Sequence, residues 1–373
     1  MNNPKDIKAL WIMPELNHYR INTFNKLSLY VNKLTILKGK ASRKEGHTDV
    51  KSENILFDFI ECKGGYNNFG YKIDTYTTLL RIIKSEHLNI VLTPLERKNI
   101  LLILFLAILK RYYNFKLVSY NHDFRKIQNN KLDSWINRIL YKMLMMFYDR
   151  IIFYTEKGMR LSIENGLISE NKAGFANNTI DTNLIFKNYY SSNIDTKDKT
   201  GIIFIGRIVE RKKLDVLFDY FKELKEVIQN IRLYIIGDGP LLQYYRETNQ
   251  SECITFLGSS NDEGFISKYM NHARMFFCPN DPGLAIQHSF AYGVPFVTFD
   301  DELNAPETDY LKDNYNCKIL KTSTKKENIN WLKGFFKDEL LYKQMSENSQ
   351  KTAENYSLER WIENILHNFT KLI

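Results

Sequence analysis

The sequence predicts an α/β protein with two facing Rossmann-like domains, each built on a parallel sheet, and an interdomain cleft. A chain of 373 residues is too long for one ordinary core. Short apolar runs with β-branched residues alternate with longer amphipathic segments, as in βαβ units. The alternation stops in the polar stretch 187–200, which is typical of a linker, and then restarts. We therefore expect domains over 1–190 and 191–355, and a C-terminal helix over 356–373 that packs back towards the first domain.

The same alternation predicts the individual elements. Expected strands are 8–13, 33–37, 89–93, 116–120 and 150–154 in the first half, and 201–205, 232–236, 254–257, 275–278 and 296–299 in the second. Expected helices are 22–30, 76–85, 99–111, 131–146 and 214–228. Ligands of doubly wound sheets bind at the carboxyl ends of the strands, so candidate functional residues should lie there.

Charge and composition limit the partners. Lysine and arginine outnumber aspartate and glutamate by 52 to 43, and the net charge is +9. This excess suits a nucleotide diphosphate, a phospholipid surface or a lipid-phosphate acceptor. There is no dense basic tract interleaved with aromatic residues, so we expect no nucleic-acid partner.

Cysteine spacing and the apolar runs indicate the compartment. The four cysteines are far apart, which argues against structural zinc and a disulfide framework and favours the reducing cytoplasm. The N-terminus lacks the pattern of a signal peptide. The longest apolar run, 100–109, is half the length of a membrane span, and we expect a buried helix that covers a sheet. Because Lys110, Arg111 and two tyrosines follow, contact with the inner face of a membrane is the alternative.

The first chemical motif directly follows the expected strand 201–205. Gly206 lets the backbone turn tightly and approach a ligand. Arg207 offers a planar fork for two phosphate oxygens, and Lys212 offers a movable positive charge. Together they could neutralise a diphosphate leaving group. The alternative is a basic loop whose side chains are solvated.

Two more motifs follow later strands. The turn Gly237-Asp238-Gly239-Pro240 reads as a structural βα junction. In the block 279–295, a glycine turn leads into a short helix, where amides around Gly283 could meet a phosphate. Asn280 and His288 lie on either side of this turn and could project towards a sugar nucleotide, although a lone helical histidine is more often structural.

In this order and spacing, the motifs resemble the nucleotide-binding domain of the retaining family-4 glycosyltransferases, which have the two-domain GT-B fold. The family pattern contains a GR…K pair, a GxGP turn, an F-x-G strand end and an EGFGL…E…AxGxP block, which this sequence matches from its GL onward. The resemblance covers about 150–320 and includes capsule and O-antigen polysaccharide transferases. Further similar elements are Phe256-Leu257-Gly258, Asn178-Thr179-Ile180-Asp181 and Asn304-Ala305-Pro306-Glu307.

The resemblance implies roles for individual residues. Arg207 and Lys212 match the diphosphate-binding pair, and Gly283 and Leu284 match the loop whose amides meet the donor phosphate and sugar. Glu307 either reaches the donor or caps a helix that begins near Thr308. The second domain would therefore bind the nucleotide sugar, and the first would bind the acceptor.

Two glutamates of the family pattern are replaced. Asn280 stands where the first contacts the donor sugar, and His288 stands where the second holds the ribose hydroxyls. Both side chains can hydrogen-bond a hydroxyl, but neither carries a fixed negative charge. Because related capsule and O-antigen transferases tolerate a histidine before S-F-A-Y-G, we interpret this as a subfamily variant.

The first half contributes three candidate residues. His122 follows the expected strand 116–120, where a polar side chain should face the cleft, and the family often places a histidine there near the donor sugar. We count it as catalytic. The turn 14–20 should form another wall, in which His18 and Arg20 contact the acceptor or have a structural role.

The resemblance implies a metal-independent hexosyltransferase without a cofactor, because a cationic pair takes the place of magnesium. Its partners would be a nucleotide-diphosphate sugar and a glycan or lipid-linked acceptor in bacterial surface polysaccharide synthesis. No pair of carboxylates resembles that of retaining glycosidases, so we expect front-face displacement with retention. The alternatives are a sugar-nucleotide epimerase or phosphorylase on the same fold, and a non-catalytic scaffold, which the loss of both glutamates would favour.

Overall fold

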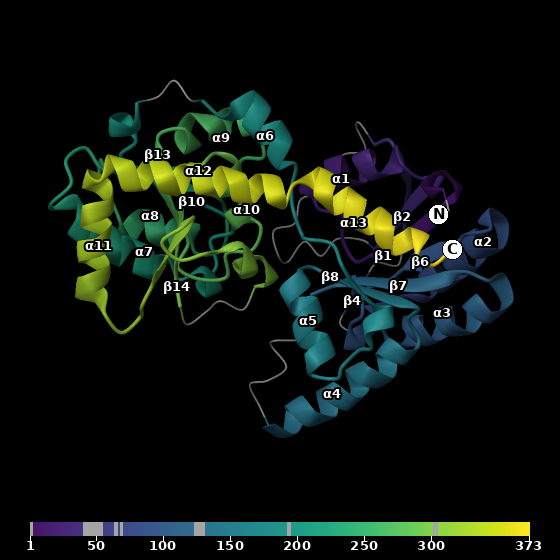
Figure 1. Cartoon of the computed structure of the whole chain (residues 1–373). Coiled ribbons are helices and arrows are strands. Elements are labelled where there is room, and N and C mark those ends of the chain that lie inside the picture. Colours follow the sequence, from purple (N-terminus) through teal and green to yellow (C-terminus); the bar gives the residue numbers. More distant parts are fainter. Residues whose placement is uncertain are drawn as a thin grey trace. The chain divides into compact units, whose positions relative to one another are not determined.

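The chain forms two compact units, each with its own parallel sheet, as the sequence predicts (Figure 1). The computed structural model describes residues 3–39, 55–62, 66–67, 70–122, 131–191, 195–300 and 305–373. Unit 1 comprises Met1–Asn178 and Leu358–Ile373, and unit 2 comprises Thr179–Ser357. The division therefore falls between Asn178 and Thr179, earlier than the expected division after residue 190.

The sheet of unit 1 has seven strands in the order β3-β2-β1-β6-β7-β8-β9, and neighbouring strands pair in parallel. The order reverses between β1 and β6, where the loops after these two strands diverge. A short antiparallel pair, β4 (Tyr66–Asn67) and β5 (Gly70–Tyr71), lies outside this sheet. The seven strands are β1 (Lys8–Met13), β2 (Lys33–Lys38), β3 (Asp58–Glu61), β6 (Ile90–Leu92), β7 (Lys116–Asn121), β8 (Arg150–Phe153) and β9 (Ala173–Phe175).

Both faces of this sheet are buried, because alternate strand residues enter different core clusters. Leu10 and Ile12 pack in the cluster with α2–α4, whereas Ala9 and Trp11 pack in the cluster with α1 and α13. The C-terminal helix therefore belongs to unit 1, where the indole of Trp361 is fully buried. The helices are α1 (His18–Ser28), α2 (Ile73–Glu86), α3 (Ile100–Tyr113), α4 (Lys131–Met146), α5 (Glu156–Glu164) and α13 (Leu358–Thr370).

Unit 2 repeats the arrangement with six parallel strands in the order β12-β11-β10-β13-β14-β15. Here the strand order reverses between β10 and β13. Ligands of such sheets bind at this switch point, at the carboxyl ends of the strands. The strands are β10 (Gly201–Ile205), β11 (Arg232–Ile236), β12 (Ile254–Gly258), β13 (Ala273–Phe277), β14 (Phe296–Phe299) and β15 (Cys317–Leu320).

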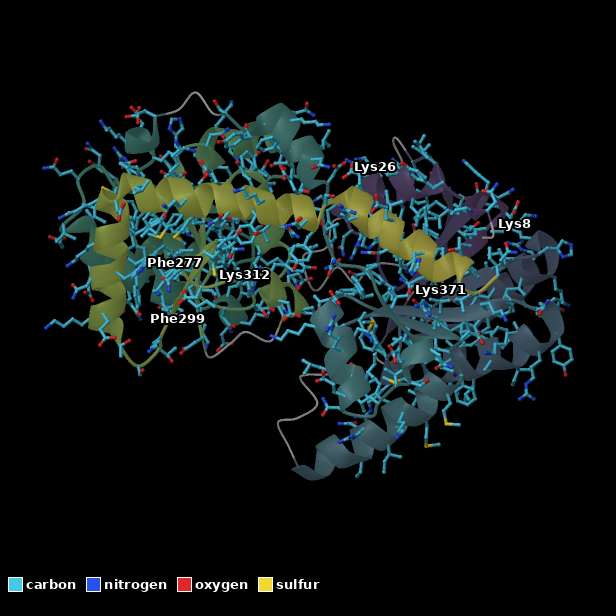
Figure 2. The ribbon with its side chains drawn as sticks, viewed as in Figure 1. Lys8, Lys26, Phe277, Phe299, Lys312 and Lys371 are labelled. Atoms are coloured by element: carbon cyan, nitrogen blue, oxygen red, sulfur yellow. The ribbon has the colours of Figure 1, made fainter. Side chains whose placement is uncertain are left out.

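Aromatic side chains fill the core of unit 2 (Figure 2). Phe277 of β13 and Phe299 of β14 are buried with their ring centroids 6.0 Å apart, and the ring of Tyr220 packs edge-on against both. The helices are α6 (Thr182–Tyr189), α7 (Leu214–Lys225), α8 (Leu242–Thr248), α9 (Glu263–Met270), α10 (Ala285–Ala291), α11 (Lys325–Lys337) and α12 (Glu339–Asn355).

Three segments differ from the expectations. The expected turn 14–20 ends at Asn17, and α1 begins at His18 rather than near residue 22. The expected linker 187–200 begins inside α6. The apolar helix α3 is buried on one side only: Leu102 and Leu106 are buried, but Leu101 is 68% exposed.

Candidate active site in unit 2

The loops that follow β10 and β13 border the switch point of the second sheet. The first contains Gly206, Arg207 and Lys212, and the second runs from Pro279 to Leu284. The candidate residues of these two motifs are therefore gathered at one edge of one sheet.

Close backbone packing explains the turn that follows β11. The amide of Gly206 donates to the carbonyl of Ile236 at 3.0 Å, and that of Ile208 donates to Asp238 at 2.8 Å. A Cβ at Gly237 would lie 1.9 Å from the carbonyl oxygen of Gly206, and one at Gly239 would lie 2.3 Å from that of Ile208. Only glycine fits at both positions, and these contacts fix the loop that presents Arg207.

Lys212 connects the two loops that border the switch point. It lies in a 3₁₀ turn, Glu210–Lys212, and its side chain is only 12% exposed. Its Nζ donates to the carbonyl oxygen of Asp281 and lies 3.9 Å from the carboxylate of the same residue. The Nε of Arg211 lies 3.2 Å from that carboxylate. In this structure Asp281 therefore partly neutralises the positive charges of Lys212 and Arg211.

The loop after β13 owes its shape to unusual backbone conformations. Asp281 and Gly283 have positive φ angles of 51° and 55°. The side-chain oxygen of Asn280 accepts from the amide of Asp281 at 2.7 Å, which stabilises the first of these residues. A Cβ at Gly283 would meet no atom within 4 Å, so the space beside this glycine is open. Leu284 follows as the half-buried N-cap of α10.

Arg207 directly follows Gly206 and is half-buried.

Cys278 directly follows β13 and is fully buried, and burial raises the pKa of its thiol to about 11. The thiol therefore stays neutral, donates to the carbonyl of Asn280 at 3.2 Å and is not a nucleophile.

His288 is held by a residue that the sequence reasoning missed. Its Nε2 lies 2.7 Å from Oε1 of Glu263 on α9, and the same oxygen accepts a 2.7 Å hydrogen bond from the hydroxyl of Tyr292. Burial opposes the charge of Glu263, but His288 and Tyr292 together outweigh it and hold the pKa of this carboxyl below its ordinary value. Through this contact, the carboxylate of Glu263 on α9 lies beside His288 on α10. No local pattern links positions 263 and 288, so only the tertiary structure reveals the pair.

Glu307 is buried within a 3₁₀ helix, Pro306–Tyr310, whose N-cap is Ala305. It therefore does not cap a helix beginning near Thr308. Asn304, which was part of the same motif, lies outside the described residues.

The candidates of unit 1 lie at the carboxyl edge of their own sheet. His122 is exposed directly after β7, and its ring packs 4.4 Å from that of Tyr154. His18 is exposed at the first position of α1.

Arg20 is 8% exposed. Its Nη2 donates to Asn178 at 2.5 Å, and its guanidinium lies 5.8 Å from the centre of the Tyr120 ring. These contacts favour the structural alternative for Arg20.

Within the described ranges, no group of three or more His, Cys, Asp or Glu side chains is arranged to hold a metal ion. In the same part of the chain, no helix has both the length and the apolar character needed to cross a membrane.

Residues 188–352 match the family model described as glycosyl transferases group 1. This group-1 domain is a little under half of the chain and contains every candidate residue of unit 2. A curated relative, the 2-deoxystreptamine N-acetyl-D-glucosaminyltransferase of Niallia circulans, is 28% identical over 131 residues. That match covers 31% of this chain but only 32% of the relative's length.

Solved structures match the whole chain in fold. Anabaena Alr3699/HepE in complex with UDP has a TM-score of 0.71 at 14% identity and covers 98% of this chain and 100% of its own. A glycosyltransferase from Rickettsia africae has a TM-score of 0.72 at 14% identity, with 98% of each chain covered. The sucrose-phosphate synthase of Thermosynechococcus elongatus has a TM-score of 0.69 at 13% identity. That match covers 98% of this chain and 99% of the synthase. The fold is thus that of the GT-B enzymes, and residues 188–352 of the second unit match the group-1 model.

Proposed function

We propose that this protein is a retaining, metal-independent glycosyltransferase that moves a hexosyl group from a nucleotide-diphosphate sugar to a glycan or lipid-linked acceptor. One observation carries the proposal. The Arg207–Lys212 loop and the Gly283 loop border the switch point of one parallel sheet, and Lys212 joins them, within a domain that matches the group-1 model. A doubly negative diphosphate is the ligand that this combination of cations and open glycine backbone suits.

The donor is proposed to bind unit 2. Arg207 and Lys212 contact the diphosphate, and backbone around Gly206, Gly283 and Leu284 approaches it. His288, oriented by Glu263, faces the ribose hydroxyls, while Asn280 and Glu307 lie nearer the sugar. Uridine is the first base to test, because the Anabaena structure of the same fold contains UDP.

In the proposed reaction, the bond between the anomeric carbon and the diphosphate oxygen breaks, and the acceptor oxygen bonds to the same face of that carbon. The departing phosphate oxygen takes the proton of the acceptor hydroxyl. Arg207 and Lys212 stabilise the negative charge that grows on this phosphate, so the step needs no further base. In unit 1, His122 is proposed to act in catalysis and His18 to contact the acceptor.

The proposal extends to the acceptor class and the biological role. Bacterial surface polysaccharide synthesis in the cytoplasm, at the inner face of the membrane, follows from the motif resemblance. It predicts a sugar-phosphate lipid or a growing glycan as acceptor. Transfer from a radiolabelled donor to such lipids tests this directly.

Binding is tested first, by calorimetric titration of UDP, GDP and ADP and of their hexose conjugates. One diphosphate should bind, and Arg207→Ala and Lys212→Ala should each weaken it about tenfold or more, since each removes a charge-assisted contact. Lys222→Ala on the exposed side of α7 is the matched control and should leave binding unchanged. If no diphosphate binds the folded protein, the scaffold alternative replaces the enzyme.

Turnover separates the remaining alternatives. A transferase leaves the donor sugar unchanged except for slow hydrolysis until an acceptor is added, whereas an epimerase converts the donor alone. The anomeric coupling constant in the product's NMR spectrum should equal that of the donor. Excess chelator should not reduce the rate, and a loss of transfer in chelator would refute the metal-independent mechanism.

A further inference from the structure

Two helices of unit 1 leave apolar stripes uncovered. The inner side of α3 is buried in the core, whereas its outer side exposes apolar residues every three to four positions. The outer side of α4 does the same. We call these residues the α3/α4 face: Leu101, Leu104, Ile108, Tyr112, Ile136, Ile139, Met143 and Met146.

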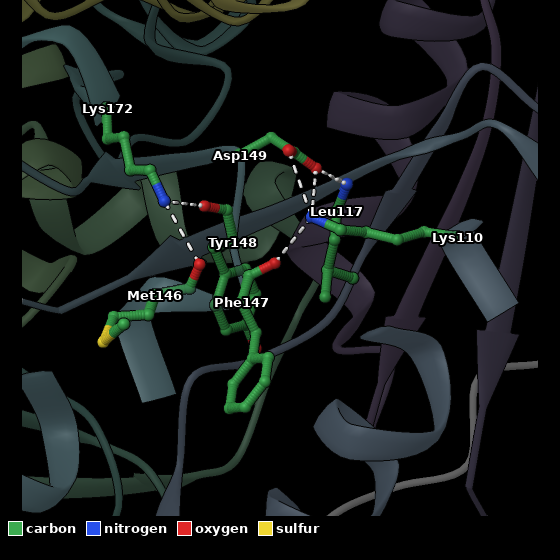
Figure 3. A network of polar contacts seen from close by, with 7 residues as sticks. All are labelled: Lys110, Leu117, Met146, Phe147, Tyr148, Asp149 and Lys172. Carbon is green, nitrogen blue, oxygen red and sulfur yellow. Dashed lines mark hydrogen bonds and ion pairs between the residues drawn. The ribbon is translucent and has the colours of Figure 1, made fainter. Parts of the chain in front are cut away.

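Polar contacts tie the last turn of α3 to the segment that follows α4 (Figure 3). Lys110, near the end of α3, donates to the carbonyl of Phe147, just after α4, at 2.9 Å and pairs with Asp149 at 3.0 Å. The carboxylate of Asp149 also accepts from the amide of Leu117 in β7 at 2.7 Å. Lys172 binds the carbonyls of Met146 and Tyr148 at 3.2 and 2.8 Å. The network fixes the end of α4 against α3 and the sheet.

The two stripes point away from the same core. Leu106 of α3 and Leu144 of α4 are buried in one hydrophobic cluster, which covers one face of the sheet. The exposed residues lie on the opposite sides of both helices, so they face outward from a single side of unit 1. Tyr112 is 78% and Met146 is 73% exposed, which is far more than a packed face would leave.

The charged residues that directly neighbour the exposed apolar residues in sequence are cations, and Asp133 near the start of α4 is the one acidic residue in the two helical sequences. Arg111 on α3 and Lys142 on α4 are exposed next to Tyr112 and Met143. The sequence of α3, and that of α4 from residue 134 onward, contains no acidic residue. Lys110 is not part of this free charge, because it is paired with Asp149.

This charge pattern selects among partners. In a twofold dimer the same patch meets itself, so Arg111 and Lys142 would face other cations. The surface of an anionic bilayer avoids that repulsion. The aliphatic side chains can insert below the lipid headgroups, and Tyr112 can lie at the level of the headgroups. We propose that the α3/α4 face docks on the surface of an anionic phospholipid bilayer. The proposal rests on the inner-face location given under the proposed function, for which it names the surface, and it does not depend on the identity of the donor.

Vesicle flotation tests the proposal with the full chain. Wild-type protein should float with vesicles of phosphatidylglycerol and phosphatidylcholine at low salt, and much less with phosphatidylcholine alone or at high salt. Arg111→Ser with Lys142→Ser should lower the partition coefficient about 25-fold, at roughly fivefold per cation. Ile108→Ser with Met143→Ser should lower it about tenfold even at low salt.

Matched pairs on unit 2 control for general effects. Lys222→Ser with Lys343→Ser removes two exposed charges, and Val227→Ser with Leu340→Ser removes two exposed apolar side chains, without touching the α3/α4 face. Both pairs should float like wild type. The melting temperature of each variant checks that it is folded. Calorimetry with nucleoside diphosphates separates this proposal from the proposed function, because every variant should still bind the donor nucleotide.

Three results would overturn the docking proposal. The first is a folded wild-type protein that does not float with anionic vesicles. The second is equal binding to phosphatidylcholine alone, which would remove the role of the cations. The third is a wild-type dimer in sedimentation that Ile108→Ser with Met143→Ser converts to a monomer, since the face would then be an interface between copies.

Discussion

Replacing Asp281 with asparagine is expected to tighten the binding of nucleoside diphosphates about two- to fivefold. In the absence of donor, the carboxylate of Asp281 lies 3.2 Å from Arg211 and 3.9 Å from Lys212. A phosphate that binds Lys212 must compete with this carboxylate. Removing the negative charge therefore ends this competition and the repulsion of the ligand, while the hydrogen bond from Lys212 to the backbone carbonyl of residue 281 remains.

The magnitude follows from distance and exposure. Two unit charges 4 Å apart interact by about 1 kcal/mol in water and by more near a protein surface. The side chain of Asp281 is 31% exposed and that of Arg211 is 54% exposed, so solvent screens both pairs. Partly exposed pairs of this kind contribute about 0.2–1 kcal/mol each. A net gain of about 0.5–1 kcal/mol corresponds to the two- to fivefold change, at 1.4 kcal/mol per factor of ten.

Asparagine suits this test because it tolerates the positive φ of 51° at this position. The dissociation constant of UDP, or of whichever diphosphate binds, is measured by calorimetry at two salt concentrations. Glu226→Gln is the matched control, because it removes one negative charge at the end of α7, away from the strand ends that carry the loops. An Asp281→Asn protein that is folded but binds no more tightly than the Glu226→Gln protein would refute the competition argument.

Three further predictions concern stability. Gly237→Ala should lower the free energy of unfolding in urea by roughly 2–4 kcal/mol, because the new Cβ would lie 1.9 Å from a backbone oxygen. Gly334→Ala should raise it by about 0.5–1 kcal/mol, because Gly334 lies in α11 with open space beside it. The pKa of Glu263 is lowered from 4.5, so its carboxylate stabilises the fold above that pH and loses this contribution as the pH falls below it. Glu263→Gln should therefore flatten the fall in melting temperature between about pH 5 and 3. Burial lowers the pKa of Lys199 to about 8, so Lys199→Met should raise the melting temperature at pH 7, and this advantage should shrink by pH 10 as the wild-type lysine loses its proton.

Much of the architecture could be predicted because buried parallel strands are short apolar runs flanked by polar turns. The ranges expected for β1, β10, β11 and β14 agree with the observed ones for this reason. β3, β9 and β15 were missed. Asp58–Glu61 begins and ends with an acidic residue, Ala173–Phe175 has three residues, and Cys317–Leu320 contains a lysine, so tertiary pairing rather than local pattern makes them strands.

The candidate site was predictable where it depends on backbone and not where it depends on side-chain pairing. The glycine turn at Gly237 and the left-handed Gly283 follow from glycine's conformational freedom at the ends of strands. The ionic contacts of Asp281 and the bond from Glu263 to His288 join positions that are far apart in sequence. For the same reason, the sequence predicted a ribose contact or a structural role for His288 but not its partner Glu263.

The return of the chain to unit 1 bears on how the protein is made. Unit 2 is inserted between Asn178 and Leu358, and α13 supplies Trp361, whose indole donates to Tyr120 at 3.0 Å, and Asn368, which binds Arg150 at 2.5 Å. A nascent chain must therefore complete all of unit 2 while one face of its first sheet still lacks this cover. A fragment intended to isolate unit 1 should join residues 1–178 to 358–373, because one that stops at residue 178 would be expected to aggregate.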